Sequence, residues 1–258
     1  YELFLGQDSG TVENCLLRPT NKLLKIAKER SLSYVFFVDT LYLHRMYHLS
    51  DKYSAIKKDL ILIQNQLRQV LKENHQVFHH IHPHWLDAKY NSSKNEWDLS
   101  DKSRFSLSTL NPALIQQVFD DSTKVLKRVY GEEKFPSMLG FRAGGLYAQP
   151  FSQYKLEMIK QGIFLDMSVL RGASSVGGGG AYQFNYSSVP DDLIYKFEDD
   201  INVKNNKGSF IEIMMENFVL EGLPKIVNGI YYRLHKNRKS WERYGDGSSS
   251  GNKIRGQE

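Results

Sequence analysis

The sequence has no long hydrophobic run. None of its apolar stretches approaches the roughly 20 residues that a helix needs to cross a bilayer, which excludes a transmembrane helix. The first residues, YELFLG, lack the basic segment and the long apolar segment of a signal peptide. They also lack an initiator methionine and resemble the end of a strand, so we expect native residues to precede Tyr1.

Cysteine is equally scarce. Cys15 is the only one in the chain, which excludes an internal disulfide framework and fits a reducing compartment. We expect it to be a small buried apolar residue, because free cysteines usually are. Together with the absence of a signal peptide, this favours a cytoplasmic protein.

Neither sign of charge dominates. The net charge is +5, and the densest basic run lies at residues 233–243. No helix-turn-helix, zinc-finger or RNA-binding signature accompanies this run. We therefore expect a solvated surface segment there and no nucleic-acid partner; the sequence gives no indication of the oligomeric state.

The composition is that of a globular protein. Hydrophobic residues make up 41% of the chain and charged residues 24%, and 258 residues fit one α/β-barrel domain. Helical periodicity covers residues 22–30, 51–73, 112–130 and 152–161. Short runs typical of strands cover residues 33–39, 76–82, 137–141, 163–169 and 209–215. This alternation predicts parallel strands joined by right-handed crossovers, in a barrel or a doubly wound sheet.

Three segments fall outside this pattern. Residues 86–110 are rich in Ser, Asp, Asn and Lys, so we expect a loop insertion. The glycines at 177–180 predict a flexible loop and not a phosphate-binding loop, because no Lys-Ser/Thr pair follows them. Residues 245–258 are expected to form a mobile tail.

Histidine is concentrated in one place. Four of the eight histidines lie within six positions, at His79, His80, His82 and His84. Imidazole is a preferred ligand of Zn, Ni, Cu and Fe. The cluster therefore predicts a metal site at the end of the strand over residues 76–82.

Geometry limits which of these histidines can share an ion. Residues four apart on a straight strand are about 13 Å apart, whereas imidazole nitrogens lie about 2.0–2.1 Å from a metal. Pro83 ends the strand, and we expect a turn there that brings His80 and His84 together. His79 should face the opposite side of the strand. His82 shares a side with His80, so it would support the ligands or replace one of them.

Several segments resemble motifs of the NodB-like polysaccharide deacetylases. Residues 75–85, HQVFHHIHPHW, are similar to the second motif, whose two metal-binding histidines correspond to His80 and His84. Residues 141–146, FRAGGL, resemble the third motif, whose arginine fixes the catalytic aspartate and corresponds to Arg142. Residues 164–168, FLDMS, resemble the strand of the fourth motif without its tryptophan. The resemblance runs to about Met215 and implies one domain with a distorted (β/α) barrel of seven parallel strands.

Two motifs of that family depart from the usual pattern here. The first motif carries two acids; the resemblance makes Glu2 the carboxylate ligand and places the general base just before Tyr1, with Asp8 as a weaker substitute. The last motif supplies a histidine as general acid, but His235, the only late histidine, lies in a different setting. The resemblance therefore implies a domain truncated at both ends.

The activity that the resemblance implies is hydrolysis of an acyl group, such as N-acetyl, from an amino sugar or polysaccharide in a bacterial surface-polysaccharide pathway. One divalent metal, Zn before Ni, Co, Fe or Mn, would polarise the acyl carbonyl and activate water. Arg142 would hold the base, and the Gly144-Gly145 turn would donate a backbone N–H to the oxyanion. The remaining candidates are Trp85 and Tyr147, as rings that stack on the sugar, and Asp166 and Ser168, as residues that support the site from behind.

Two alternatives stay open. The first is a metal-dependent amidase or esterase that acts on a non-sugar substrate, because a fold does not fix a substrate. The second is an inactive barrel that only binds glycan, which the incomplete first and last motifs favour.

Overall fold

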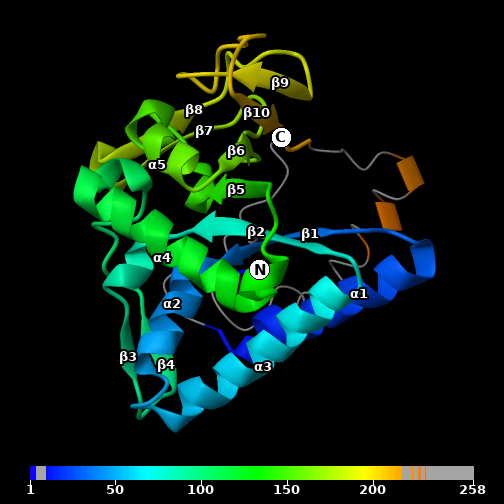
Figure 1. The fold of residues 1–258 in the computed structure, drawn as a ribbon, viewed down its shortest axis with the longest axis vertical. Coiled ribbons are helices and arrows are strands. Elements are labelled where there is room, and N and C mark those ends of the chain that lie inside the picture. The colour runs from blue at the N-terminus through cyan, green and yellow to red at the C-terminus, as the bar shows by residue number, and fades with distance from the viewer. Residues whose placement is uncertain (4–9, 217–221, 224–225, 228–229, 231–258) are drawn as a thin grey trace.

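The computed structural model describes residues 1–3, 10–216, 222–223, 226–227 and 230. Its centre is a six-stranded sheet in the order β1-β2-β5-β6-β10-β9 (Figure 1). The strands are β1 (Val35–Asp39), β2 (Gln76–Ile81), β5 (Leu139–Ala143), β6 (Ile163–Asp166), β10 (Phe210–Ile213) and β9 (Ile194–Phe197). The first five are parallel, and β9 is antiparallel to β10. Each of the five strands predicted from the sequence lies in this sheet.

Helices connect the parallel strands. They are α1 (Arg18–Arg30), preceded by a π-helical turn (Glu13–Leu17), α2 (Thr40–Leu49), α3 (Ser54–Lys72), α4 (Pro112–Tyr130) and α5 (Lys155–Lys160). From β1 to β6 each connection adds the next strand on the same side of the last one, so right-handed crossovers place the helices on one face. Both α3 and α4 pack against β2 through their buried apolar stripes. This layer fixes the strand that carries the histidines.

The sheet is open in the described part of the chain. At one edge β9 runs antiparallel, which ends the parallel series. At the other edge Tyr1 lies beside β1: its backbone nitrogen donates to the Phe37 carbonyl (2.7 Å), and its carbonyl accepts from the Asp39 N–H (3.0 Å). This is the pattern of a parallel pair. The described residues therefore form an open, mainly parallel sheet, and the distorted barrel of seven parallel strands expected from the sequence does not close among them.

Strand β1 passes directly into α2, a helix that the sequence pattern missed. Asp39, the last residue of β1, caps α2 by accepting a hydrogen bond from the Tyr42 N–H (3.2 Å). The helix buries Leu41, Leu43 and Met46. This abrupt transition leaves a buried carboxyl group at the carboxyl end of the sheet.

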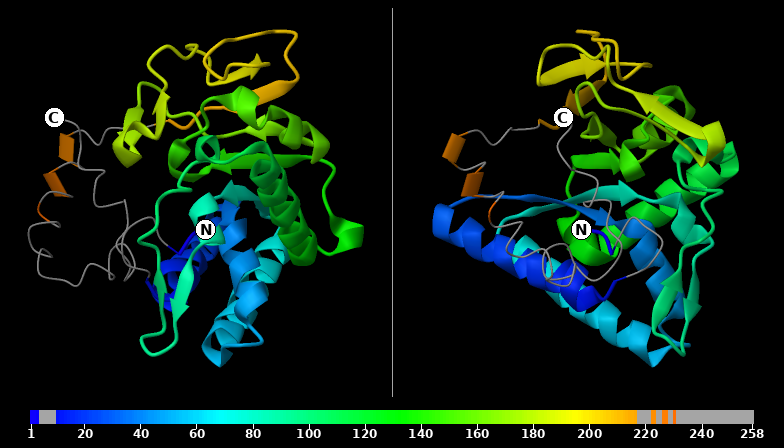
Figure 2. Two further views of the ribbon diagram at one scale, coloured as in Figure 1. Left: turned by 90° about the vertical axis from the view of Figure 1, so that its left-hand side faces the viewer. Right: turned by 180° about the vertical axis from the view of Figure 1, so that it is seen from behind.

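Two small hairpins lie outside the main sheet. Residues 86–110, expected to be a loop, contain β3 (Lys89–Asn91), β4 (Glu96–Asp98) and a 3-10 helix (Leu107–Thr109). This hairpin projects from the end of the molecule opposite β9 (Figure 2). The second hairpin joins β7 (Ser174–Gly177) to β8 (Tyr182–Asn185). The glycine run, expected to be a flexible loop, turns between these two strands as a short 3-10 helix (Gly178–Gly180).

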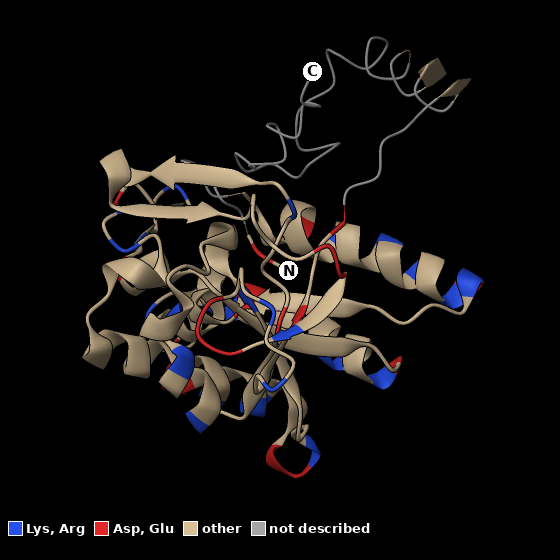
Figure 3. Ribbon diagram, turned by 90° about the horizontal axis from the view of Figure 1, so that it is seen from above, with Lys and Arg blue, Asp and Glu red and all other residues tan. Residues whose placement is uncertain are grey.

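Charged residues are distributed over several helices and loops, and Lys and Arg do not gather on one element (Figure 3). Among the described residues, none of the helices combines the length and the apolar character needed to cross a bilayer. The basic run at residues 233–243 and the tail at 245–258 lie outside the described residues.

Candidate metal centre

The predicted site lies at the carboxyl ends of neighbouring parallel strands. Strand register places Asp39 of β1 beside His80 of β2, and His80 beside Arg142 of β5. On the next strands, Asp166 of β6 pairs with Glu212 of β10. Loops at this end of a parallel sheet carry the active sites of many α/β proteins. The fold therefore gathers ionisable side chains from five strands along one edge.

Three side chains from distant parts of the sequence meet at this edge. Glu2 Oε2 lies 3.1 Å from His80 Nε2 and 2.9 Å from His82 Nε2, and the two Nε2 atoms are 3.0 Å apart. Both imidazoles are buried, whereas the Glu2 side chain is 32% exposed. The group is therefore closed on the imidazole side and open to solvent on the carboxylate side.

A hydrogen bond fixes the tautomer of His80. Its Nδ1 lies 2.8 Å from the carbonyl oxygen of Arg142. Because a carbonyl only accepts, Nδ1 must carry the hydrogen, and Nε2 of the neutral ring presents a lone pair. That lone pair faces the Glu2 carboxylate oxygen. Two acceptors at this distance need a cation or a proton between them.

The charge states suit a cation. Burial alone would raise the pKa of Glu2, but the neighbouring His80 and His82 side chains hold the pKa of this carboxyl well below its usual range. Burial lowers the pKa of His82 to about 4. At neutral pH the group thus combines an ionised carboxylate with a neutral buried imidazole, the states in which these side chains bind metals.

The spacing also fits a metal ion. Three ligand atoms bound at about 2.0–2.1 Å to a tetrahedral ion lie about 3.3 Å from one another. The separations of 2.9–3.1 Å here are shorter by only a few tenths of an ångström. Glu2, His80 and His82 therefore form a group that could hold a metal ion.

His82 takes the place predicted for His84. Strand β2 continues in extended form through His82, so His80 and His82 point to the same side. The turn at Pro83 does not bring His84 to Glu2 and His80. His84 lies in the 3-10 helix Pro83–Leu86 and stacks on Phe105, with ring centroids 5.7 Å apart. Neither of its nitrogens has a hydrogen-bond partner among the described residues, and burial lowers its pKa to about 2.

The two aromatic side chains expected to stack on a substrate are buried. Trp85 is 1% exposed, and its Nε1 donates to Asp39 Oδ2 at 2.6 Å. Tyr147 is 8% exposed, its hydroxyl bonds Ser175 Oγ at 3.0 Å, and its ring is covered by other aromatic rings. Neither ring is exposed in this structure, and the stacking of Trp85 and Tyr147 on a sugar stays a prediction.

Arg142 and the Gly144-Gly145 turn lie near the group but do not belong to it. The Arg142 guanidinium lies over the Phe37 ring, 4.0 Å from its centroid, and its Nε donates to the Met167 carbonyl (2.9 Å). Gly144 passes so close to His82 that a side chain there would overlap the ring. The roles expected for Arg142 and the two glycines in catalysis stay predictions.

A buried chain of hydroxyl groups supports the histidine strand from the helix side. Thr40 Oγ1 donates to the His80 carbonyl (3.1 Å), so Ser122 Oγ must donate to Thr40 (2.6 Å) and His79 Nδ1 must donate to Ser122 (2.6 Å). His79 thus faces α4, opposite His80, as predicted. The chain links α2, α4 and β2 behind the metal group.

The other carboxyl groups of this edge form a buried pair. Asp166 Oδ1 accepts from the Ser168 N–H (2.7 Å), and Glu212 Oε1 accepts from the Val169 N–H (3.1 Å). Asp166 Oδ2 and Glu212 Oε2 are buried and have no hydrogen-bond partner among the described residues. Burial raises the pKa of both carboxyl groups, which favours a protonated form of the pair. Ser168 Oγ in turn accepts from the Ala143 N–H (2.9 Å), so Asp166 and Ser168 hold the end of β5 and do not contact Glu2.

Glu212→Gln should change how stability depends on pH. Burial, and then the charge and hydrogen bond of Asp166, raise the pKa of Glu212 well above its usual range; the nearby guanidinium of Arg142 opposes this. Such a group contributes fully below its unfolded pKa of about 4.3 and loses its contribution as pH rises through the folded pKa. Glutamine keeps a donor for Asp166 and an acceptor for Val169, but cannot ionise. Other titratable groups that sense the pair are Tyr154, Tyr186 and Tyr195.

We therefore expect the variant to gain stability relative to the wild type as pH rises above about 4.3. Urea denaturation of both proteins between pH 4 and pH 8 measures this difference. Parallel stability profiles would show that Glu212 is ionised in the folded protein.

Comparisons with known proteins give a distant structural similarity. No protein-family model and no curated protein matches the sequence. The structure is similar to a crystal structure from Mycobacterium smegmatis described as a "putative polysaccharide deacetylase", with 16% sequence identity and a TM-score of 0.41. The match covers 84% of this chain and 58% of that one, so this chain spans less than two thirds of its length.

Proposed function

We propose that the protein is a metal-dependent hydrolase that removes an acyl group, such as acetyl, from an amino sugar or polysaccharide. The observation that carries this proposal is the convergence of Glu2 Oε2 with Nε2 of His80 and Nε2 of His82. Two imidazoles and one carboxylate form the ligand set of several catalytic zinc sites, in which the fourth position stays open. Zinc is therefore the metal we expect first.

The chain's own residues prepare this site for binding a cation. Arg142 orients His80 through its backbone carbonyl, which keeps the Nε2 lone pair directed at Glu2. The imidazoles are shielded from water, and solvent and substrate reach the group from the side of the partly exposed Glu2. When bound, the metal would polarise an acyl carbonyl and lower the pKa of a water molecule. The Gly144-Gly145 turn is the candidate donor to the oxyanion.

The substrate class comes from the resemblance of residues 75–85 and 141–146 to NodB-like motifs. The test is release of acetate from N-acetylglucosamine oligomers by the full-length, zinc-loaded protein. Glu2→Gln keeps the size of the side chain but removes its charge, so we expect it to bind zinc at least about 100-fold more weakly and to release no acetate. Glu13, an exposed acid on the turn before α1, provides the matched control as Glu13→Gln.

Two results would contradict the proposed function. If Glu2→Gln binds zinc and releases acetate as the wild type does, the group is not the active site. If the zinc-loaded wild type releases no acetate from any oligomer, the substrate class is wrong.

A further inference from the structure

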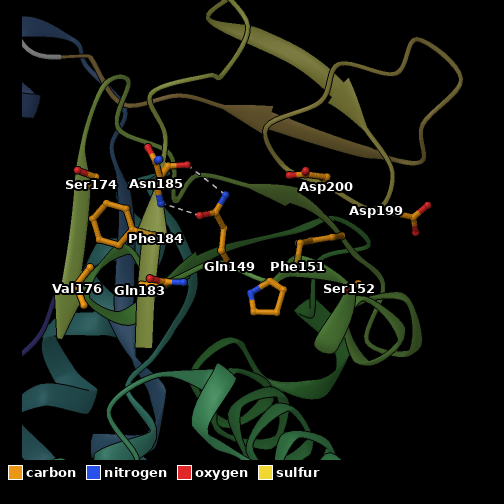
Figure 4. A pocket seen from close by; sticks show the side chains of 11 residues that line it. Gln149, Phe151, Ser152, Ser174, Val176, Gln183, Phe184, Asn185, Asp199 and Asp200 are labelled. Atoms are coloured by element: carbon orange, nitrogen blue, oxygen red, sulfur yellow. Dashed lines mark hydrogen bonds between the residues drawn. The ribbon is translucent and has the colours of Figure 1, made fainter. Parts of the chain in front are cut away.

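One cavity lies away from the metal group. It has a volume of about 800 Å³, within the range of ligand sites. Figure 4 shows that the hairpin β7–β8 forms one wall, with Ser174, Val176 and Gln183 on it, and that Asp199 and Asp200 lie on the opposite side. Gln149 and the residues after it form the floor between these walls.

Cross-links between the walls hold the cavity open. The Gln149 side chain accepts from the Asn185 N–H (2.7 Å) and donates to the Asn185 carbonyl (3.3 Å), which fixes β8 to the floor. Asn202 Nδ2 also donates to the Asn185 carbonyl (2.8 Å), and Lys155 Nζ donates to Asp199 Oδ1 (2.7 Å). The two walls and the floor are thus held in place before any ligand arrives, which lowers the entropic cost of binding.

The lining offers uncommitted hydrogen-bonding groups. Three polar side chains that line the cavity have no hydrogen-bond partner among the described residues: Ser152, Ser174 and Gln183. Apolar surface lies between them, from Val176 (68% exposed) and Pro150. Such a mixture of hydroxyl, amide and apolar groups matches the hydroxyl groups and C–H faces of a sugar.

Charge narrows the class of ligand. Two carboxylates, Asp199 and Asp200, line the cavity; Lys155 pairs with Asp199, whereas Asp200 has no cationic partner among the described residues, and no Lys or Arg side chain lines the cavity. A phosphate or an acidic sugar would meet unfavourable electrostatics here. A neutral saccharide, whose hydroxyl groups can donate to carboxylate oxygens, fits this lining.

The cavity is connected to the metal centre through one short segment. Gly144 contacts the region of His82, and Gln149, five residues later, lines the cavity. Five residues span at most about 18 Å. On the hairpin, Ser175 bonds Tyr147 of this same segment, while its neighbours Ser174 and Val176 line the cavity. An oligosaccharide of a few residues has a length comparable to this separation.

We propose that this cavity binds a neutral oligosaccharide, as a second binding site beside the metal centre. The kind of sugar rests on the proposed function, whereas the site itself rests on the cavity and its lining. The site would hold a stretch of the chain at a distance from the acyl group that is removed. Its effect should therefore grow with the length of the substrate.

Calorimetric titration of the metal-free protein with the tetramer of N-acetylglucosamine tests the proposal without any catalysis. Gln183→Trp fills the cavity from an exposed strand position, and we expect it to lower the affinity at least 10-fold. Gln116, exposed on α4, provides the matched control as Gln116→Trp, which should bind as the wild type does. The acidic tetramer of galacturonic acid should not bind.

Three outcomes would overturn the proposal: no binding of the tetramer to the wild type, equal binding to Gln183→Trp, or equal binding of the acidic tetramer. Binding that Gln183→Trp abolishes supports it even if no acetate is ever released, and in that case only the proposed function fails. If acetate is released but Gln183→Trp leaves KM for the tetramer unchanged, the metal centre acts without this cavity and the proposal fails alone.

Discussion

Replacing His82 by phenylalanine should abolish stoichiometric zinc binding, whereas the same substitution at His84 should leave it unchanged. His82 Nε2 lies within 3.0 Å of both other candidate ligand atoms, so its loss leaves only two ligands. Residues that merely orient a ligand cost 10–100-fold in metal affinity when replaced, so loss of a ligand should cost at least about 100-fold. Titration with a competing chelator measures this difference.

His84→Phe serves as the matched control for this experiment. The His84 ring already stacks on Phe105, and neither of its buried nitrogens has a hydrogen-bond partner among the described residues. Removing two unpaired polar atoms while keeping a ring should leave the free energy of unfolding unchanged or raise it by about 1–3 kcal/mol. The reverse result, with zinc lost in His84→Phe and kept in His82→Phe, would restore the pair predicted from the sequence.

The sequence located the histidine site but did not identify the second histidine of the group. The density of histidines located the site, and the period of two along a strand placed His80 and His82 on one side. The position at which the strand ends decided between His82 and His84. That position depends on packing between distant segments: the His84 ring stacks on Phe105, 21 positions later, a contact that no local pattern contains.

In the fold, too, local elements could be predicted from the sequence and long-range pairing could not. Helical and strand periodicity located the five parallel strands and most helices, because each buries one apolar face locally. The sequence pattern does not reveal α2, because Asp39 both ends strand β1 and caps the helix, so no turn separates the two elements. The edges of the sheet could not be predicted either. Whether the sheet closes depends on pairing between distant segments, and β9 at one edge lies between loops with weak periodicity.

The missed site residues are buried polar groups. Glu212 and Ser122 lie inside a strand and a helix that the pattern identified, but their partners, Asp166 and His79, are more than 40 residues away in the chain. A charged or hydroxyl residue in a run of buried positions is a usable signal, since such groups are normally paired. It identifies the residue but not its partner.

Gly144→Ala should weaken zinc binding about 10–100-fold without replacing any ligand. A Cβ at this position would lie 2.6 Å from His82 Nδ1 and 2.6 Å from the Ile81 carbonyl oxygen. The carbonyl is backbone in the sheet and cannot move away easily, so the imidazole must shift, and its Nε2 leaves the position facing Glu2. Crowding of this kind costs about 1–3 kcal/mol of stability.

Gly162→Ala separates the effect on the metal from the effect on stability. Gly162 follows α5 with φ +70°, and a Cβ there would meet no atom within 4 Å. Alanine in this left-handed conformation costs about 1–2 kcal/mol, comparable to the expected loss at Gly144, but it touches nothing near the imidazoles. Zinc affinity should therefore fall in Gly144→Ala alone, measured beside urea denaturation of both variants. Equal zinc affinities in the two proteins would mean that the His82 ring has room to move, and that the close approach of Gly144 does not position the ligand.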